Sequence, residues 1–318
     1  MHHIKASKFN VYPNKKMKDQ IVKGVLLTFT LLSASFIFIV AATILIQGIK
    51  PFITDNQGLG RVSLIPFLVG DTWLTGVSFQ SNLYSVGFII VSTLFTALLS
   101  LLLSFPIGVL TALFIAKIAP KKLSNMLRTV IELLASIPSI IYGLFGAGVI
   151  LRFVYNLSNA LGYQSKGGNS MLASVIVLAI MTIPTITSIS EVAIRSVDQK
   201  LIEGSLALGA SQTQTYFKVV LFAAKSGIFT GAILGIGRAL GEATAISLVS
   251  GGRRSGFSFN LFDTTSTLTT IMLEGMKETT GLDYDIRFSV GTILIVVILM
   301  TNSILNLIKR KVGNIDVK

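Results

Sequence analysis

The chain has 318 residues, of which 52% are hydrophobic and only 13% are charged, and its mean hydropathy is +0.75. Soluble globular proteins carry about a quarter charged residues, so this composition indicates a polytopic membrane protein. The sequence contains no cysteine, which excludes disulfide bonds, thiolate metal ligands and cysteine nucleophiles. The two histidines, His2 and His3, lie together in a polar N-terminal tail, so we expect no metal site and no histidine-based catalytic site.

Six apolar segments are each long enough to cross about 30 Å of hydrocarbon as a helix. The first of them is too long for the apolar region of a signal peptide, so we expect an uncleaved membrane anchor. The sequence therefore predicts an all-α polytopic membrane protein with six transmembrane helices. The predicted spans are 24–49, 85–117, 130–155, 171–194, 226–250 and 288–308.

The second apolar run continues from Val86 to Ala119 without a polar turn. Its length would allow two spans, but two spans would place Lys117 and Lys121 on the outer side of the membrane. We therefore expect one long, tilted helix over 86–119 that is kinked near Pro106.

The distribution of basic residues predicts the orientation. With the N-terminus inside, 18 of the 27 basic residues fall on the cytoplasmic side, as the positive-inside rule requires. Topology then explains most of the net charge of +13, and no nucleic-acid partner is needed. Both ends are expected in the cytoplasm, with 50–84, 156–170 and 251–287 outside. The inner basic residues are Lys5, Lys8, Lys15, Lys16, Lys18, Lys23, Lys117, Lys121, Lys122, Arg128, Arg195, Lys200, Lys218, Lys225, Lys309, Arg310, Lys311 and Lys318.

The inner segment 195–225 is amphipathic and contains few glycines and no proline. We expect Glu203 to start a short helix, Gly209 to break it, and a second short helix to follow. Such a unit is either an ordinary connector at the membrane surface or a knob that contacts a soluble partner.

The spacing within this segment resembles the EAA loop of ABC importer permeases. The corresponding residues here are Glu203, Gly204 and Ser205, then Gly209 after three residues, then Val219 and Leu221 after nine more. In that family the loop forms the coupling helix that docks into the ATPase subunit, so the resemblance implies ATPase coupling for the first four residues. Phe222 stands where the family has proline, so the helix break that proline would cause is missing.

Further motifs over about residues 85–310 resemble the PstC-type subunit of the bacterial phosphate ABC transporter. The resemblance implies a type I ABC importer permease fold, with inorganic phosphate as the substrate and the cytoplasmic (inner) membrane as the location. The domain 85–310 would follow a tail over 1–23 and a first helix with its outer loop over 24–84, and would precede a tail over 311–318. The motifs are ELLASIPSIIYGL at 132–144, AIMTIPTI at 179–186, LALGA at 206–210 leading into AKSGI at 224–228, and GIGRALGEA at 235–243.

In that family the partners are a second permease of PstA type, an ABC ATPase dimer and an extracytoplasmic phosphate-binding protein. A homodimer in place of the PstA-type subunit stays open. The chain has no GxxxxGK[ST] P-loop, so we expect no ATP site and no other cofactor in it, with ATP bound by the separate ATPase.

Three other functions are weighed against phosphate import. A permease for another small oxyanion, molybdate or sulfate, belongs to the same class. A secondary transporter would work without an ATPase, whereas the inner segment favours ATP dependence. A membrane-embedded enzyme would need clustered histidine or carboxylate residues near a membrane surface, a pattern that we do not find.

The predicted fifth span carries a row of glycines and two charged residues. On one continuous helix, Gly227, Gly231, Gly235, Arg238 and Glu242 fall within about 80° of one face. Glycines let another helix approach closely. A charge near the bilayer centre costs at least about 2.5 kcal/mol, so this face is expected to look into protein or water.

Two hypotheses explain the charges. Arg238 and Glu242, four residues apart, form either a structural ion pair that locks two helices or part of the anion path. Arginine suits the second role because its guanidinium binds phosphate through two parallel hydrogen bonds.

Three residues of the predicted third span, Pro138, Ser139 and Tyr142, are further candidates for the substrate pathway through the resemblance. Pro138 and Pro184 are expected mainly to kink their helices, and Tyr142 either packs in the interior or donates a hydrogen bond to substrate.

Two weaker candidates lie at the ends of spans. Glu132 is expected at the inner interface rather than at the substrate. Arg253 and Arg254, just outside the fifth span, either attract phosphate or its loaded binding protein or form a solvated basic turn.

Overall fold

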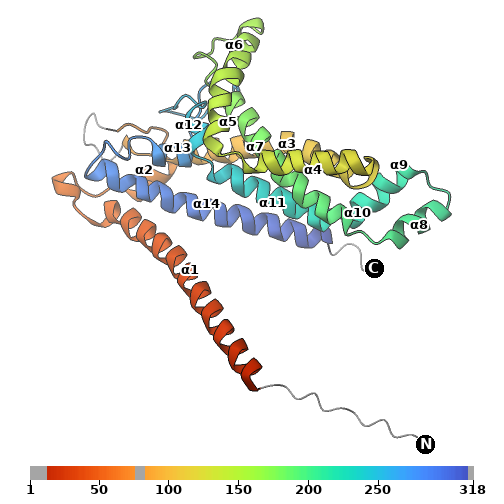
Figure 1. The fold of residues 1–318 in the computed structure, drawn as a ribbon. Helices are drawn as coiled ribbons and strands as arrows, with labels where there is room; N and C mark the ends of the chain where they lie inside the picture. Colours follow the sequence, from red (N-terminus) through yellow and green to blue (C-terminus); the bar gives the residue numbers. More distant parts are fainter. Residues whose placement is uncertain (1–12, 76–82, 314–318) are drawn as a thin grey trace, which may run out of the picture.

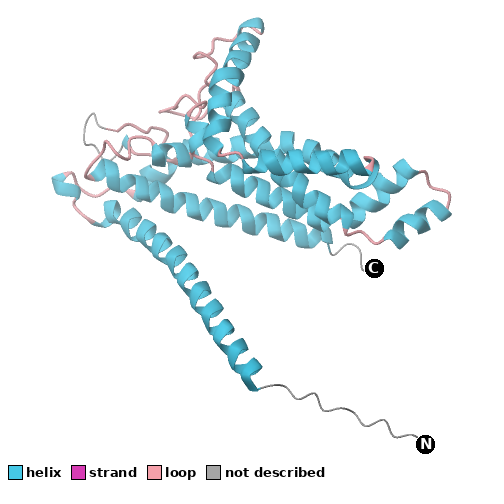
Figure 2. Cartoon of the chain, viewed as in Figure 1, coloured by secondary structure: helices cyan, strands magenta, loops and turns pink. Residues whose placement is uncertain are grey.

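The computed structural model describes residues 13–75 and 83–313. The two histidines lie outside these ranges, as do Lys5, Lys8 and Lys318, which entered the predicted topology. The described chain is helical and carries no β-strand (Figure 2).

Long apolar helices build the molecule (Figure 1). Five helical segments are long and apolar enough to cross a membrane, and a sixth is added if one bent pair of helices counts as a span. This confirms a multi-pass membrane protein. Within the bundle α3 packs along α7, α7 along α11, and α11 along α14. The long helices are α1 (Pro13–Ile53), α3 (Gly87–Leu113), α7 (Met171–Arg195), α11 (Lys225–Gly241) and α14 (Leu282–Gly313).

Helix α1 joins the bundle only near its C-terminal end. Ser289 of α14 donates a hydrogen bond to the carbonyl of Gly48 (2.7 Å), and Lys50 pairs with Asp285 (2.6 Å). A Cβ at Gly48 would lie 2.7 Å from the carbonyl oxygen of Phe288, so glycine permits this close approach. Toward its N-terminus α1 diverges from the other helices, and its apolar side chains are exposed (Figure 1).

The second predicted span is one crossing, as expected. Helix α3 continues without a break into η3 (Phe114–Ile118), a turn of π-helix, and passes through Pro106. The basic residues that follow it therefore remain at one end of the bundle.

The predicted third span begins later than expected. Residues 121–136 form a separate amphipathic helix, α4, and the apolar span runs over 139–160 instead of 130–155. Pro138 has no N–H to continue α4 and holds Ile137 in an extended conformation, which separates the two helices. The helices are α4 (Lys121–Ser136), α5 (Ser139–Phe145), η4 (Gly146–Ile150) and α6 (Leu151–Ala160).

The orientation of these helices differs from that of a single kinked span. Helix α4 runs alongside the bundle, whereas α5 and α6 project away from it (Figure 1). Pro138 therefore joins two helices of different direction rather than kinking one.

The prediction of one helix over 226–250 is also wrong. Helix α11 ends at Gly241, and a separate turn, α12 (Thr244–Ser247), follows. At its other end α11 meets the preceding helical segment at an angle of 67°. That segment comprises α9 (Gln212–Gln214), η5 (Thr215–Val220) and α10 (Leu221–Ala223).

The two long predicted outer segments are folded. A hydrophobic cluster that includes Phe67, Trp73, Tyr84 and Leu268 joins them to α3 and α14, and the rings of Trp73 and Tyr84 meet edge to face at 5.7 Å. Their helices are η1 (Asn56–Gly58), α2 (Leu64–Val69) and α13 (Leu268–Leu273).

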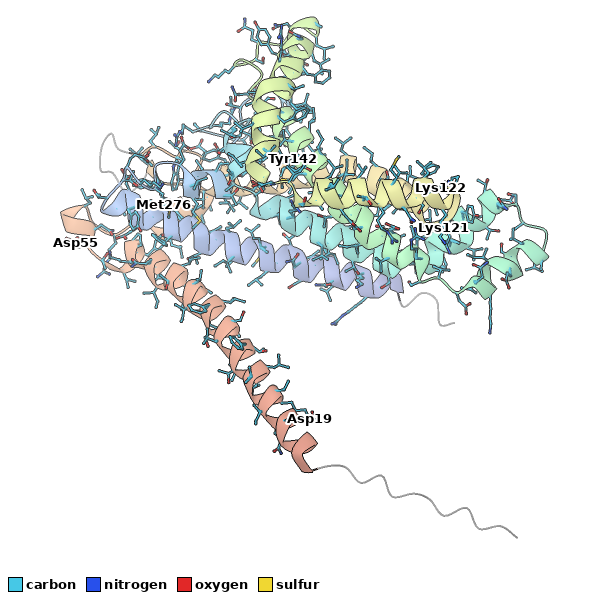
Figure 3. The ribbon with its side chains drawn as sticks, viewed as in Figure 1. Asp19, Asp55, Lys121, Lys122, Tyr142 and Met276 are labelled. Carbon is cyan, nitrogen blue, oxygen red and sulfur yellow. The ribbon has the colours of Figure 1, made fainter. Side chains whose placement is uncertain are left out.

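The predicted inner segment lies at the opposite end of the bundle, where α8 (Gln199–Ala207) packs against η5. Lys121 and Lys122 lie at this end, Asp55 and Met276 at the other, and Tyr142 between them (Figure 3).

Candidate functional site

Arg238 is placed by α11 against α7. Its Nη1 donates a hydrogen bond to Oγ1 of Thr185 at 3.3 Å, and the residue is half-buried. The guanidinium also acts electrostatically on Tyr142. One neutral hydroxyl uses little of the hydrogen-bonding capacity of a guanidinium, which has five N–H donors. The remaining donors are the chemistry that an oxyanion would use.

Glu242 does not pair with Arg238, contrary to the ion-pair hypothesis. The residue leaves the helix with φ −78° and ψ 120°, and its Oε1 accepts a hydrogen bond from the backbone N–H of Ala245 at 2.9 Å. The carboxylate thus caps α12 instead of facing back along α11. The described ion pairs contain no Arg238–Glu242 contact. The expectation of one shared helical face fails because the helix ends at Gly241.

The glycine row faces α7. A Cβ at Gly227 would lie 2.3 Å from the side chain of Ala193, and one at Gly235 would lie 2.9 Å from Ile186. At Gly231 the nearest atom, a backbone oxygen of Ile186, would be 3.3 Å away. The three glycines therefore set the close packing of α11 on α7, which in turn places Arg238 beside Thr185.

The candidates of the third span lie at the break before α5. Tyr142 is buried, and its hydroxyl donates to the carbonyl of Leu134 on α4 at 2.7 Å. Ser139 is the first residue of α5 and Pro138 immediately precedes it. Gly143 packs on α12, where a Cβ would lie 2.9 Å from Cα of Ala245. Tyr142 thus links α5 back to α4 across the break. The next residue, Gly143, packs directly against α12, the short helix that follows Glu242.

The inner knob consists of α8, a glycine turn and α9. Helix α8 begins at Gln199, so Glu203 lies in its middle rather than at its start as predicted. Gly209 follows the helix with φ +85°, a left-handed conformation that favours glycine. Glu203, Gly204 and Gly209 are exposed, and Leu208 is 91% exposed.

The knob is tied to the helix that leads into α11. The hydroxyls of Ser205 on α8 and Thr215 on η5 are hydrogen-bonded at 2.8 Å. Ser211 forms a capping box with Gln214 at the start of α9. A force on α8 can therefore reach α11 through η5 and α10.

Glu191 is a buried charge that sequence reasoning missed. It lies on α7, and its Oε1 accepts hydrogen bonds from Arg128 Nη2 and from Arg195 Nε, both at 2.7 Å. Arg195 also donates to Ser124 Oγ (3.0 Å) and to the carbonyl of Ile115 (3.2 Å). This cluster, the Glu191 network, joins η3, α4 and α7 beside the knob. Glu191 and Arg195 lie four residues apart near the end of an apolar span, and this spacing is the sequence signal that could have revealed the network.

The basic pair Arg253 and Arg254 is not simply solvated. Arg253 Nε donates within its own loop to the carbonyl of Gly256 (2.6 Å), and its Nη1 lies 3.4 Å from Asp263. Arg254 forms an ion pair with Glu274. Glu132 lies exposed on α4.

Residues 104–314 match the family described as "Binding-protein-dependent transport system inner membrane component". The chain is 37% identical over 254 residues to the probable ABC transporter permease protein YqgH of Bacillus subtilis, covering 79% of this chain and 78% of that protein. It is 29% identical over 288 residues to the phosphate transport system permease protein PstC 1 of Mycobacterium tuberculosis, covering 81% and 85%. The PstC of Pasteurella multocida is 31% identical over 237 residues, covering 70% and 74%.

Solved structures share the fold. A chain of the bacterial alginate ABC transporter in complex with its pentasaccharide-bound periplasmic protein superposes with a TM-score of 0.64 at 18% identity, covering 95% of this chain and 98% of that one. The inward-facing MetNI methionine ABC transporter gives a TM-score of 0.55 at 20% identity, covering 70% and 94%. At these identities the likeness concerns the fold alone, and it confirms the type I ABC importer permease fold.

Proposed function

We infer the function of this chain from its family: it belongs to the binding-protein-dependent transport system inner membrane components. Its relatives are permease subunits of ABC transporters, so its role is transport rather than catalysis. The substrate that we propose is inorganic phosphate. The observation that carries this proposal is the similarity to PstC phosphate permeases, which spans 70–81% of the chain.

The partners follow from the same proposal. A second permease subunit of PstA type, or a second copy of this chain, completes the path across the membrane. A dimer of ABC ATPases binds and hydrolyses ATP, and an extracytoplasmic binding protein delivers phosphate.

We propose that the end of the molecule with Lys121, Lys122 and the knob faces the cytoplasm. The end with Asp55 and Met276 then faces outward, and both chain termini are cytoplasmic. Two features support this orientation: Lys121 and Lys122 lie at the knob end (Figure 3), and the positive-inside rule places basic residues in the cytoplasm.

In the proposed mechanism the ATPase dimer moves the knob, whose exposed residues are Glu203, Gly204 and Gly209. The Ser205–Thr215 hydrogen bond passes this motion to η5 and α10. The 67° bend between α10 and α11 converts it into a shift of α11 against α7. This shift moves Arg238, the residue of α11 that we propose binds phosphate.

Arg238 is proposed to bind phosphate in transit. In the structure its guanidinium contacts Thr185, and phosphate competes for its other donors when the helices part. Glu242, Pro138, Ser139 and Tyr142 shape the surroundings: Glu242 caps α12, and the other three form and close the break beside it.

Phosphate uptake by the complete complex in proteoliposomes tests the proposal. We expect ATP-dependent uptake of labelled phosphate that unlabelled phosphate suppresses and that an excess of sulfate or molybdate leaves unchanged. Suppression by sulfate or molybdate alone would transfer the assignment to that oxyanion. Uptake without the ATPase subunit would contradict an ABC mechanism.

The orientation is tested on the cysteine-free chain with single cysteines and a membrane-impermeant thiol reagent. A cysteine at Lys121 or Lys200 should react only after the membrane is permeabilised, whereas one at Asp55 should react in intact cells. Labelling of position 121 or 200 from outside would overturn the orientation.

A further inference from the structure

A polar cavity of 430 Å³ lies at the end of the bundle opposite the knob. It is formed where α12 and the turn after it meet α13. Hydroxyl groups, two glycines and one ion pair dominate its lining. The lining residues are Ser247, Ser250, Gly251, Gly252, Arg254, Thr270, Leu273 and Glu274.

The walls of this cavity are fixed by the fold. Gly251 has φ +79°, and a Cβ on it would lie 2.5 Å from the Thr264 side chain, so only glycine fits there. Thr269, the neighbour of the lining residue Thr270, donates to the carbonyl of Glu242 at 2.7 Å. The chain segment that begins at Arg238 and Glu242 therefore leads directly to the cavity, whose wall it forms over residues 247–254.

The ion pair of the cavity is open to solvent. Arg254 and Glu274 are 39% and 47% exposed in their side chains, so their mutual attraction is screened and weak. A carboxylate and a phosphate can each accept two parallel hydrogen bonds from a guanidinium. An oxyanion entering the cavity can therefore take the place of Glu274 on Arg254.

A second guanidinium lies behind the first. Arg287 of α14 is 3% exposed, and within the described structure its Nε and Nη1 have no hydrogen-bond partner. The carboxylates of Asp283 and Glu274 attract this guanidinium, whereas Arg254 repels it. Asp283 is also engaged by the hydroxyl of Tyr84, whose pKa is raised by burial, so that the phenol stays a donor.

The turn that carries Glu274 covers this second guanidinium. Gly275 has φ +70°, and a Cβ on it would lie 2.7 Å from Arg287 Nη2. Buried N–H groups without a partner are costly and attract any anion that can reach them. A Glu274 carboxylate released from Arg254 thus has an alternative cation next to its own backbone.

We propose that this cavity is an outer binding site for a small oxyanion, with Arg254 as its main ligand and Glu274 as the group that the oxyanion displaces. The hydroxyls of Ser250 and Thr270 supply the remaining hydrogen bonds, and Arg287 holds Glu274 while the site is occupied. This inference rests on the proposed function for its ligand, inorganic phosphate. It adds a binding site that phosphate reaches before Arg238.

Protection of a single cysteine tests the site without requiring transport. The cysteine-free chain allows Ser247→Cys, at an exposed position of the cavity wall, in the purified full complex in phosphatidylcholine vesicles. With phosphate at about ten times its dissociation constant, the rate of maleimide labelling should fall about tenfold. The matched control is Leu64→Cys, an exposed position on α2 at the same end, whose labelling rate should not change.

Two further variants identify the ligands. Arg254→Gln should abolish the protection of Ser247→Cys, whereas Glu274→Gln should give protection at lower phosphate because the competing carboxylate is gone. If Arg254 only stabilises the loop, both variants lower the yield of the complex alike and leave protection unchanged, and the proposal is wrong. Unchanged protection in Arg254→Gln at normal yield also overturns it.

A lipid headgroup carries the same phosphate chemistry, and the vesicles distinguish the two sources. Slow labelling that needs phosphatidic acid in the membrane and does not respond to added inorganic phosphate would assign the cavity to a lipid and overturn the proposal. Protection by inorganic phosphate in a complex that takes up no phosphate would leave the site standing and refute the transport function instead.

Discussion

Glu191 at the knob end and Glu274 at the opposite end are both paired with arginine, but their surroundings differ. Glu191 is buried and accepts hydrogen bonds from two arginines, and one of these also binds Ser124 and a backbone carbonyl. Glu274 is half-exposed, has one arginine partner among the described ion pairs and borders the outer cavity. In the Glu191 network the protein's own groups occupy the guanidinium donors, so a substrate anion finds few to bind. At Glu274 the guanidinium groups of Arg254 and Arg287 keep donors that an anion can use.

Arg238 resembles the second arrangement. It has a single hydroxyl partner in the described structure and no carboxylate, although Glu242 is near it in the sequence. The number of partners that an arginine has therefore distinguishes two roles. Fully paired arginines hold helices together, whereas arginines with few partners are available to bind a substrate. The following variants are chosen to break that distinction, beginning with the largest expected effect.

Glu191→Ala should cause the greatest loss of stability. It leaves Arg128 and Arg195 without their shared anion at the junction of η3, α4 and α7. Removing one partner of a buried ion pair costs about 3–5 kcal/mol, and the partial exposure of both arginines places this case near about 3 kcal/mol. Thermal unfolding and yield of the purified complex measure it.

The control for Glu191 is Glu191→Gln, which keeps an acceptor for both arginines and should lose less stability. Substrate specificity should not change in either variant. A Glu191→Ala complex with normal stability and altered phosphate affinity would mean that the network belongs to the substrate path.

Arg238→Gln should affect transport rather than stability. Charge-assisted hydrogen bonds of about 1.5–3 kcal/mol to the oxyanion are lost, so phosphate uptake should fall by up to about 100-fold while the complex still assembles. Thr185→Val is the matched change, because it removes only the hydroxyl partner and should reduce uptake far less. A loss of complex in proportion to the loss of uptake would assign Arg238 a structural role.

The sequence predicted the long spans well, because twenty or so consecutive apolar residues are sufficient to identify a crossing helix. It did not locate the ends of α4 and α11. At Gly241 the apolar pattern continues across the break, and only the capping of α12 by Glu242 reveals where the helix stops. The sequence predicts a kink at Pro138. The direction that the chain takes after Pro138 is set by tertiary contacts such as the packing of α5 on α12.

The charges show the same limit. The row of glycines and Arg238 could be placed on one face from their spacing, because helical periodicity is local. The Glu191 network could not be assembled in this way, since Arg128 lies 63 residues from Glu191 in the sequence and on another helix. Long-range pairing of charges is decided by tertiary packing, which one sequence does not display.

Gly209→Val should uncouple the knob from its ATPase. A branched residue at φ +85° costs about 1–2 kcal/mol, and this strain would distort the exposed turn. We expect uptake to fall more than ATP hydrolysis does, or the ATPase to dissociate, as measured by both rates and by co-purification. Gly209→Asn is the control, because asparagine tolerates the left-handed conformation of this turn far better than valine does. Normal coupled transport by the valine variant would exclude this turn as the coupling element.

Glu242 gives the smallest effect and the sharpest test of the distinction between paired and unpaired charges. Its carboxylate caps α12, and loss of a helix cap costs about 1 kcal/mol, so Glu242→Ala should lower stability by about that amount. Glu242→Gln retains an acceptor and should keep uptake within about twofold of the native complex. Because the two side chains do not touch, the losses caused by Arg238→Gln and Glu242→Gln should add within about 0.5 kcal/mol in the double variant. A larger coupling energy, or rescue of uptake by exchanging the two residues, would restore the ion-pair lock and remove Arg238 from the path of the substrate.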